Sequence, residues 1–272
     1  DLEPVLRPVL VFRQAIRARV GAKAGFPVGD PLRVETPRGL VVVGSPTKDV
    51  HEGHAWLLVD PGGHDVYRGT AGGTGTSLRS ALCLDLGGDD RYVATDPFVQ
   101  GGAWNGVGIL IDVQGNDRYE GGAFSQAATV GGVSLLADGL GEDVVEATEF
   151  AQGAAALGCA LLRSGAGDDR FAVDRLGQGL GRTAGYGVLH DTGGNDRYVA
   201  RPTHESMYSQ WTNGRTVHWS FAQGCGFGFY ARYAEELPDG SQGLVIRDLI
   251  PGGVGVLKDS RGDDRYTGSM YA

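Results

Sequence analysis

Apolar and polar residues alternate along most of this chain, and the alternating stretches recur at a nearly fixed distance. Five of them have the form G-x-[G/S/A]-x-L-x and end just before an aspartate or a serine, at 106–111, 132–137, 158–163, 185–190 and 253–258. Alternation with period two is typical of a β-strand, and the recurring leucine is expected to point into a core. Earlier apolar runs predict further strands at 39–44 and 55–60.

An eight-residue phrase of the form D-x-x-G-x-D-x-aromatic follows these strands, with small departures. It occurs seven times, starting at Asp60, Asp85, Asp112, Asp138, Ser164, Asp191 and Asp259. Successive copies start 25, 27, 26, 26, 27 and 68 residues apart. A fixed period of this length is the signature of a repeat architecture. We therefore predict an all-β, right-handed parallel β-helix (a solenoid) with about 26 residues per coil, in which each coil holds three short strands and three turns.

A second motif recurs on the other side of the repeat. An aromatic residue or leucine stands two places before a glutamine at 98–100, 124–126, 150–152 and 176–178. Because stacked coils lie about 4.8 Å apart, we expect the aromatic rings to stack. For the same reason we expect the four glutamines to hydrogen-bond one another in an amide ladder.

Residues 1–35 lie outside the repeat and are predicted to form a helix and a linker. Val9, Phe12, Ile16 and Val20 have helical spacing and alternate with basic residues. We expect a short N-terminal helix that caps the open end of the solenoid. A helix that binds a membrane surface or a partner is the alternative.

The solenoid is predicted over 36–272, with an inserted region at about 200–252. Within the insertion, Asn213-Gly214 predicts a hairpin turn, 230–237 one or two helical turns, and 244–246 a strand. The sequence begins at Asp1 and ends within a repeat, so we expect a mature, excised or partial product whose last coil is covered or continued by another segment.

Composition narrows the choice of partners and compartment. The net charge of -9 argues against nucleic acid and anionic membranes as partners, and it favours cations or basic surfaces. No apolar run is long enough to span a bilayer. Three cysteines at different places in the repeat, Cys83, Cys159 and Cys225, predict no disulfide framework.

The aspartates of the phrase are the main candidate site residues. Stacking the coils places them in two columns of like charge, in which neighbours about 4.8 Å apart repel by about 3 kcal/mol at an effective dielectric constant of 20. Calcium ions between coils would offset this repulsion, because calcium binds six to eight oxygen atoms. The candidate calcium ligands are Asp60, Asp65, Asp85, Asp90, Asp112, Asp117, Asp138, Asp143, Asp169, Asp191, Asp196, Asp259 and Asp264.

Two alternatives need no metal. Arginine follows the second aspartate in five copies and would neutralise the column by ion pairing, at Arg91, Arg118, Arg170, Arg197 and Arg265. Backbone N–H groups of the turns are the other source of hydrogen bonds for the carboxylates.

The end of the phrase, G-x-D-x-[Y/F], resembles the second half of the calcium-binding nonapeptide of RTX proteins. It matches at Gly63/Asp65/Tyr67, Gly88/Asp90/Tyr92, Gly115/Asp117/Tyr119, Gly167/Asp169/Phe171, Gly194/Asp196/Tyr198 and Gly262/Asp264/Tyr266. The leading Gly-Gly is missing, and the period of about 26 residues differs from that of RTX coils. Over 36–272 the repeat also looks like Gly/Asp-rich repeat proteins of environmental bacteria, a resemblance that implies export and supplies no catalytic residues.

Two further groups of residues are candidate sites. Asp49, His51, Glu52 and His54 crowd one predicted loop, where they suit a transition metal or a polar turn. The insertion gathers aromatic, histidine and acidic residues that suit a sugar-binding face, a hydrolytic cleft or a packed hairpin. These are His204, Glu205, Trp211, His218, Trp219, Tyr230, Glu235, Glu236, Asp239 and Asp248.

The leading hypothesis is a non-enzymatic, calcium-stabilised scaffold or interaction module of an exported protein, located outside the cell, in the periplasm or at the cell surface. Its expected partner is another protein or its own C-terminal continuation, with polysaccharide as a further candidate. One alternative is a carbohydrate-active enzyme, a polysaccharide hydrolase or lyase with a site near the insertion. The other is a structural subunit of a larger assembly.

Overall fold

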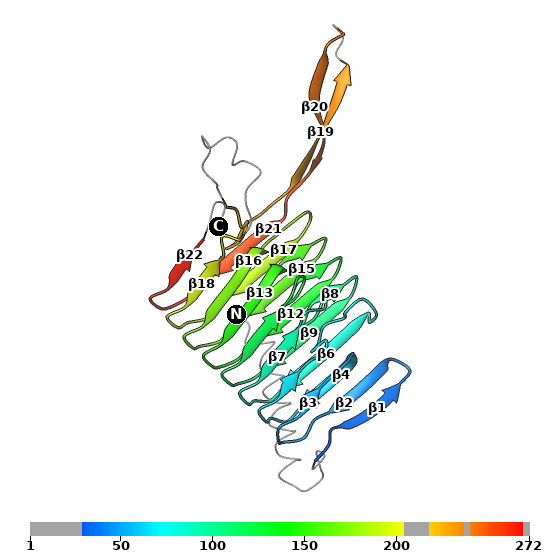
Figure 1. Cartoon of the computed structure of the whole chain (residues 1–272), viewed down its shortest axis with the longest axis vertical. Coiled ribbons are helices and arrows are strands. Elements are labelled where there is room, and N and C mark those ends of the chain that lie inside the picture. The colour runs from blue at the N-terminus through cyan, green and yellow to red at the C-terminus, as the bar shows by residue number, and fades with distance from the viewer. Residues whose placement is uncertain (1–28, 204–217, 237–239, 269–272) are drawn as a thin grey trace.

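The computed structural model describes residues 29–203, 218–236 and 240–268, with the backbone alone described for 229–236 and 242–250. Over these residues the chain is an all-β solenoid whose coils stack into an elongated body (Figure 1). No helix occurs in this part of the chain, so none there is long and apolar enough to cross a membrane. The predicted fold class is confirmed, whereas the helix expected at 9–23 lies outside the described residues.

The first wall of the solenoid is a nine-stranded sheet to which every coil contributes one strand. Only β1 and β2 pair antiparallel, and all other neighbours pair parallel. In spatial order its strands are β1 (Leu32–Thr36), β2 (Gly39–Val43), β4 (Ala55–Asp60), β6 (Ser80–Asp85), β9 (Val107–Asp112), β12 (Val133–Ala137), β15 (Cys159–Arg163), β17 (Tyr186–His190) and β21 (Val254–Lys258). Residues 32–36, assigned to the linker from sequence, thus form the first strand of this sheet.

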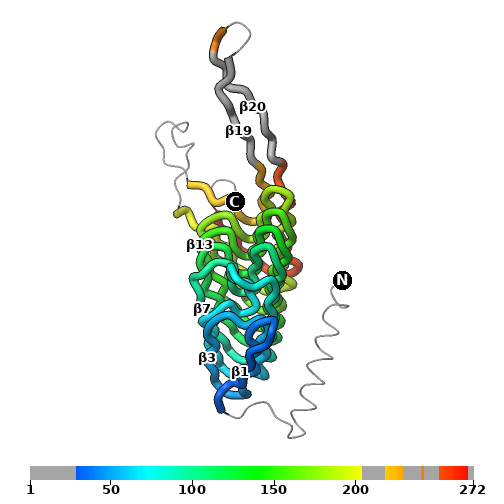
Figure 2. Tube along the Cα trace, turned by 90° about the vertical axis from the view of Figure 1, so that its right-hand side faces the viewer, coloured from blue at the N-terminus to red at the C-terminus, as the bar shows by residue number. Residues whose placement is uncertain are grey.

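The second wall is an eight-stranded parallel sheet, and a short three-stranded parallel sheet forms part of a third. Figure 2 shows the stacked coils, with β3, β7 and β13 of the second wall along one side. The second wall contains β3 (Val50–His51), β5 (Val66–Tyr67), β7 (Arg91–Ala94), β10 (Arg118–Gly121), β13 (Val144–Ala151), β16 (Arg170–Gly177), β18 (Arg197–Ala200) and β22 (Arg265–Thr267). The third contains β8 (Ala103–Trp104), β11 (Thr129–Val130) and β14 (Ala155–Ala156). The three walls agree with the three strand positions per coil that the length of the repeat predicts.

Equivalent residues of successive phrases face each other directly across the coils. Asp60 pairs with Asp85, which pairs in turn with Asp112. The recurring leucine points inward as predicted. Leu110, Leu136, Leu162 and Leu189 are buried in one continuous core. Tyrosine rings form a second interior stack, with centroids 4.4 Å apart for Tyr67 and Tyr92 and 4.6 Å apart for Tyr92 and Tyr119.

The 68-residue gap between the last two phrases contains one further coil with two insertions. Strand β21 pairs with β17, and β22 pairs with β18, so the stack resumes in register after the gap. Phe221-Ala222-Gln223 occupies the aromatic–glutamine position between the insertions, and Gln223 donates to the carbonyls of Tyr198 and Thr267. The second insertion is an antiparallel hairpin of β19 (Phe229–Glu236) and β20 (Gln242–Ile250) that extends from the stack (Figure 1). The helical turns predicted over 230–237 are therefore wrong, the strand at 244–246 is confirmed, and the hairpin turn at Asn213-Gly214 lies outside the described residues.

The glutamine motif forms a turn with unusual backbone angles. Phe98 and Gln100 have φ values of 59° and 51°, and the later copies are similar. Each glutamine amide donates to two backbone carbonyls, as Gln100 does to Tyr92 (3.1 Å) in its own coil and to Glu120 (2.9 Å) in the next. The expected glutamine–glutamine ladder is not formed by Gln100, Gln126, Gln152 and Gln178, and each of them instead ties two coils together through the backbone. The aromatic rings follow one another in a column but are tilted rather than stacked, with centroids 5.3 Å apart and planes at 39° for Phe98 and Phe124.

The glycine of the phrase is required because coils touch there through their backbones. A Cβ atom on Gly141 would lie 1.5 Å from the carbonyl oxygen of Gly115, and one on Gly167 would lie 1.4 Å from that of Gly141. No side chain fits in this space, so the glycine column fixes the close approach of successive turns.

Candidate metal centres in the interior carboxylate columns

Both aspartate columns lie inside the solenoid, next to the hydrophobic core. Because strand residues alternate in direction, the first aspartate of a phrase points inward with the residue two places before it. Eleven of the thirteen predicted ligands have exposed fractions of 0–3%, namely Asp60, Asp65, Asp85, Asp90, Asp112, Asp117, Asp138, Asp143, Asp169, Asp191 and Asp196. Asp259 and Asp264, in the last described coil, are only partly buried.

The first aspartate of a phrase accepts hydrogen bonds from two directions in four coils, whereas Asp138 Oδ1 and Asp191 Oδ2 are buried without a partner. The Oδ1 atom accepts from the backbone two residues later, as in Asp60, which lies 2.9 Å from the nitrogen of Gly62. The Oδ2 atom accepts from a tyrosine hydroxyl of the preceding coil, as between Tyr92 and Asp112 at 2.7 Å. The same bond joins Tyr67 to Asp85, Tyr119 to Asp138 and Tyr198 to Asp259. The aromatic stack and the first column thus hold each other in place.

The second aspartate of a phrase links one coil to the coil before it. Asp90 Oδ1 accepts the backbone N–H of Asp65 at 2.6 Å, and Asp117 Oδ1 accepts that of Asp90 at 2.7 Å. The pattern continues to Asp143, Asp169, Asp196 and Asp264. Backbone hydrogen bonds, one of the two alternatives to metal, therefore satisfy one oxygen of each carboxylate in this column.

The other oxygen of the second aspartate has no donor in several coils. Oδ2 of Asp65, Asp90, Asp117 and Asp196 is fully buried and has no hydrogen-bond partner. In the pairs Asp60–Asp65 and Asp85–Asp90 the two side chains are neighbours, and a hydrogen bond forms between them only when one carries a proton. Leaving a buried carboxylate oxygen unpaired costs more than about 1–3 kcal/mol. Each pair therefore needs a proton or a cation.

Burial also shifts the acidity of these groups. It raises the pKa of Asp60 to about 8, of Asp65 to about 7 and of Asp90 to about 9, and it is the largest cause in each case. Repulsion from Asp85 raises the pKa of Asp60 and Asp90 further, whereas backbone hydrogen bonds act in the opposite direction. Burial likewise raises the pKa of Asp117 to about 10. Without a cation, the interior therefore retains protons near neutral pH.

One coil departs from the pattern in two places at once. Val145 stands where the stack has tyrosine, and Ser164 stands where the next phrase has its first aspartate. The Ser164 hydroxyl donates to Asp169 Oδ2 at 2.5 Å, so this carboxylate has a donor that the other coils lack. In this coil the tyrosine donor and its carboxylate acceptor are lost together. In the next coil Phe171 also lacks a hydroxyl, but Asp191 is retained and its buried Oδ2 has no partner. The tyrosine–aspartate pairs were missed from sequence, and this paired departure was the signal that could have revealed them.

The arginines of the phrase do not neutralise the columns in the described part of the chain. Their side chains lie on the outer surface, and three of them pair with glutamates, as Arg91 does with Glu120 at 2.8 Å and Arg118 with Glu146 at 3.0 Å. Strand alternation explains this placement, because a residue next to an inward-pointing aspartate points outward.

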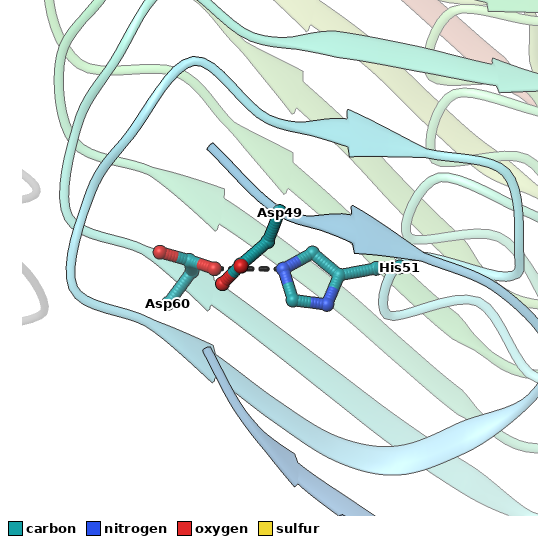
Figure 3. A group of neighbouring side chains, drawn as sticks. All are labelled: Asp49, His51 and Asp60. Atoms are coloured by element: carbon teal, nitrogen blue, oxygen red, sulfur yellow. Dashed lines mark hydrogen bonds and ion pairs between the residues drawn. The ribbon is translucent and has the colours of Figure 1, made fainter. Parts of the chain in front are cut away.

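The first end of the columns is closed by a histidine (Figure 3). His51 pairs with Tyr67 across the sheet, stacks on its ring at 4.8 Å and places Nε2 2.7 Å from Asp60 Oδ2. Asp49 takes the second-aspartate position and donates its N–H to Asp65. Both Asp49 and His51 are buried, whereas Glu52 and His54 are exposed. The four residues expected to share one loop site therefore divide between interior and surface, and His51 takes the role of a tyrosine.

The donor atoms of the columns fit a hard divalent cation. Groups of three aspartates bring one oxygen each to within 4.8 Å of one another, about twice a calcium–oxygen distance of about 2.4 Å. Such groups are Asp60/Asp65/Asp85, Asp85/Asp90/Asp112, Asp117/Asp138/Asp143 and Asp169/Asp191/Asp196. Their all-oxygen chemistry suits calcium or magnesium better than metals that prefer nitrogen or sulfur.

For most residues of the candidate cleft in the insertion, the structure describes no side-chain position. His204, Glu205, Trp211 and Asp239 lie outside the described residues, and for Tyr230, Glu235, Glu236 and Asp248 only the backbone is described. Trp219 lies against the solenoid, 4.9 Å from the ring of Phe221 and under the guanidinium of Arg175.

Comparisons of the chain with protein-family models, with curated proteins and with solved structures found no match.

Proposed function

We propose that this chain is a non-enzymatic structural or interaction module whose solenoid is stabilised by calcium ions bound between its interior carboxylates. The observation that supports the proposal is the set of buried Oδ2 atoms without a donor. One divalent ion for each pair of aspartates would neutralise both charges, which no described arginine or lysine does. The role of calcium is to link one coil to the next, and the outer faces remain available to a protein partner.

Protons alone are a poor substitute for such ions near neutral pH. Six phrases carry both aspartates. If each pair shared one proton that the unfolded chain releases, stability would fall by about 8 kcal/mol per pH unit, because each proton contributes about 1.4 kcal/mol. A typical domain has about 5–15 kcal/mol in total. A metal that replaces these protons removes this dependence, and an exported module meets the higher calcium concentration that weak sites require.

Refolding tests the proposal directly, because ions in a closed interior exchange slowly with a chelator. The protein is unfolded in denaturant with chelator, freed of metal, and refolded at pH 7.5 in calcium, in magnesium or in chelator. We expect calcium to restore the β-sheet circular dichroism and a melting temperature at least 15 °C above that in chelator, with about one ion per aspartate pair by elemental analysis. Equal melting temperatures in all three solutions and no retained metal would overturn the calcium proposal.

A further inference from the structure

The outer faces of the two large sheets differ in chemistry. The eight-stranded sheet carries ion pairs on its outer face, such as Arg91–Glu120 and Arg175–Glu149. The nine-stranded sheet, whose strands follow one another along the stack in Figure 1, carries an apolar residue at the central outward position of each strand. In spatial order these residues are Val34, Val41, Leu57, Leu82, Ile109, Leu135, Leu161, Val188 and Val256. We call them the central column.

Further apolar residues widen the central column on one side in each half of the stack. From β9 to β21 they occupy the outward position before it, at Val107, Val133, Cys159, Tyr186 and Val254. In β1, β2 and β4 they lie on the opposite side of it, at Leu32, Val43 and Val59. The central column and these flanking residues form one continuous patch, which we call the apolar stripe.

The apolar stripe is open to solvent in the described part of the chain. Val34, Val133, Tyr186 and Val254 have 43%, 49%, 48% and 54% of their surface exposed. The remaining residues of the central column are partly exposed between their neighbours. Contiguous apolar surfaces of this extent are rare on soluble proteins unless something covers them.

The size of the apolar stripe matches one side of a stable protein–protein interface. Nine strands about 4.8 Å apart, with two outward positions about 6.6 Å apart, give a patch of about 43 Å by 13 Å, or about 560 Å² in projection. A standard interface buries about 800 Å² on each partner, of which a little more than half is apolar. The stripe therefore supplies the apolar part of such an interface and needs only a polar rim around it.

A second copy of the chain has the shape and chemistry that the stripe requires. The outer face of one regular sheet packs on another such face at a distance of about 10 Å, with the side chains interdigitating. A two-fold axis through the centre of the stripe, at Ile109 in the fifth of the nine strands, matches the stripe to its own copy. Arg163, His190 and Lys258 flank the stripe in its C-terminal half, where charged residues suit the rim of an interface.

We propose that the chain forms a two-fold dimer in which the apolar stripes of two copies pack face to face. This inference rests on the interaction role proposed above and names its partner as the same chain, but it does not depend on the identity of the bound metal. The eight-stranded sheets, with their surface ion pairs, face solvent in this dimer.

Light scattering of the protein in calcium, from about 1 µM to about 100 µM, tests the proposal. We expect twice the chain mass of 28.5 kDa at the upper end of this range. Leu135→Lys, near the centre of the stripe, should raise the dissociation constant at least 100-fold. The control Val93→Lys, on the outer face of the eight-stranded sheet, should leave it unchanged, and circular dichroism melts check that both variants fold. A monomer throughout this range, or a dimer that Leu135→Lys leaves intact, would overturn the proposal.

Cross-linking tests the position of the two-fold axis without a disruptive charge. A Cys159→Ser/Cys225→Ser background leaves only the buried Cys83. In that background we expect a short bis-maleimide reagent to join Ile109→Cys to its own copy, and Val93→Cys to give no cross-linked dimer. Equal yields from the two variants would contradict the face-to-face arrangement.

The reactivity of Cys159 distinguishes a second copy from other occupants of the stripe. In a Cys225→Ser background its reaction with an aromatic disulfide reagent should slow at least 10-fold as the protein concentration rises through the dissociation constant. A slow rate at every concentration would show that another segment of the chain covers the stripe, and a fast rate at every concentration would show that it stays open. Either result would reject the dimer. A calcium-stabilised monomer would reject only the dimer, and a dimer with equal melting temperatures in calcium and chelator would reject only the calcium proposal.

Discussion

Raising the pH should destabilise the metal-free protein, in contrast to the usual behaviour of carboxylates. Burial raises the pKa of Asp65, Asp143 and Asp196 to about 7 and that of Asp191 to about 8, from 3.8. The folded state therefore keeps protons that the unfolded chain has already released at pH 5. Their contribution to stability is fully present below pH 3.8 and is lost as the pH rises through about 7 to about 8.

The size of this effect follows from proton linkage. One proton held only by the folded state lowers the free energy of unfolding by about 1.4 kcal/mol per pH unit. If two carboxyl groups behave in this way, the protein loses about 5 kcal/mol between pH 5 and pH 7. Burial lowers the pKa of His51 and His190, so these two groups contribute with the opposite sign below about pH 6.5. They offset part of the loss, but the described interior contains many more aspartates than histidines.

Two measurements in chelator would establish the effect. Urea denaturation between pH 5 and pH 7.5 gives the change of midpoint with pH. Unfolding at pH 6 in unbuffered solution, followed by titration, counts the protons released, and we expect several per molecule and at most about one per aspartate pair. Both measurements are repeated in calcium, where metal replaces protons and the dependence on pH should largely disappear.

A constant or rising urea midpoint from pH 5 to pH 7.5 in chelator, without proton release, would refute this reasoning. It would mean that the columns are ionised and balanced by something other than protons. If the urea midpoint depends on pH in the same way in calcium and in chelator, the interior is protonated in both solutions and the proposed metal binding is contradicted.

Further predictions concern single contacts, each measured by urea denaturation at constant pH and calcium. Tyr119→Val and Asp138→Ser should each destabilise by about 2 kcal/mol, because each leaves a buried partner without its hydrogen bond, while the double variant should lose less than the sum; strict additivity would contradict the pairing. Gly141→Ala should cost about 3 kcal/mol or more, since its Cβ would overlap a carbonyl of the preceding coil, and a cost below 1 kcal/mol would show that the coils can separate locally. Gln126→Leu should cost about 3 kcal/mol by leaving two backbone carbonyls without a donor, whereas a neutral result would show that water replaces the amide.

The period of the sequence was sufficient to predict the fold and the register. Gly, Gly, Leu and Asp recur at alternate positions of these strands, and the strands themselves recur at nearly constant spacing. Parallel stacking with equivalent residues facing each other is the arrangement that this pattern predicts, and the structure has it. The helical turns predicted over 230–237 failed because a tyrosine- and alanine-containing segment is compatible with both periods. Its antiparallel pairing with β20 across the hairpin stabilises the strand.

The partners of the carboxylates were harder to predict than their positions. Like charges in a column suggest either arginine or metal, and a local pattern does not show which donors lie one coil away. The hydroxyl of Tyr92 meets Asp112 only because the stack brings residues twenty positions apart into contact. The separation of His51 from His54 has the same origin, since strand β3 places the first inside and its turn places the second outside.

The constant register of the nine-stranded sheet from β4 to β21 makes this part of the molecule modular. Residues 91–117 and 118–143 are equivalent units, and each meets its neighbours through the same backbone and carboxylate contacts. Duplication of one unit within the gene would lengthen the rod by about 4.8 Å and add one aspartate pair without altering the other coils. Such a protein can change its length in evolution, or by engineering, in steps of a single coil.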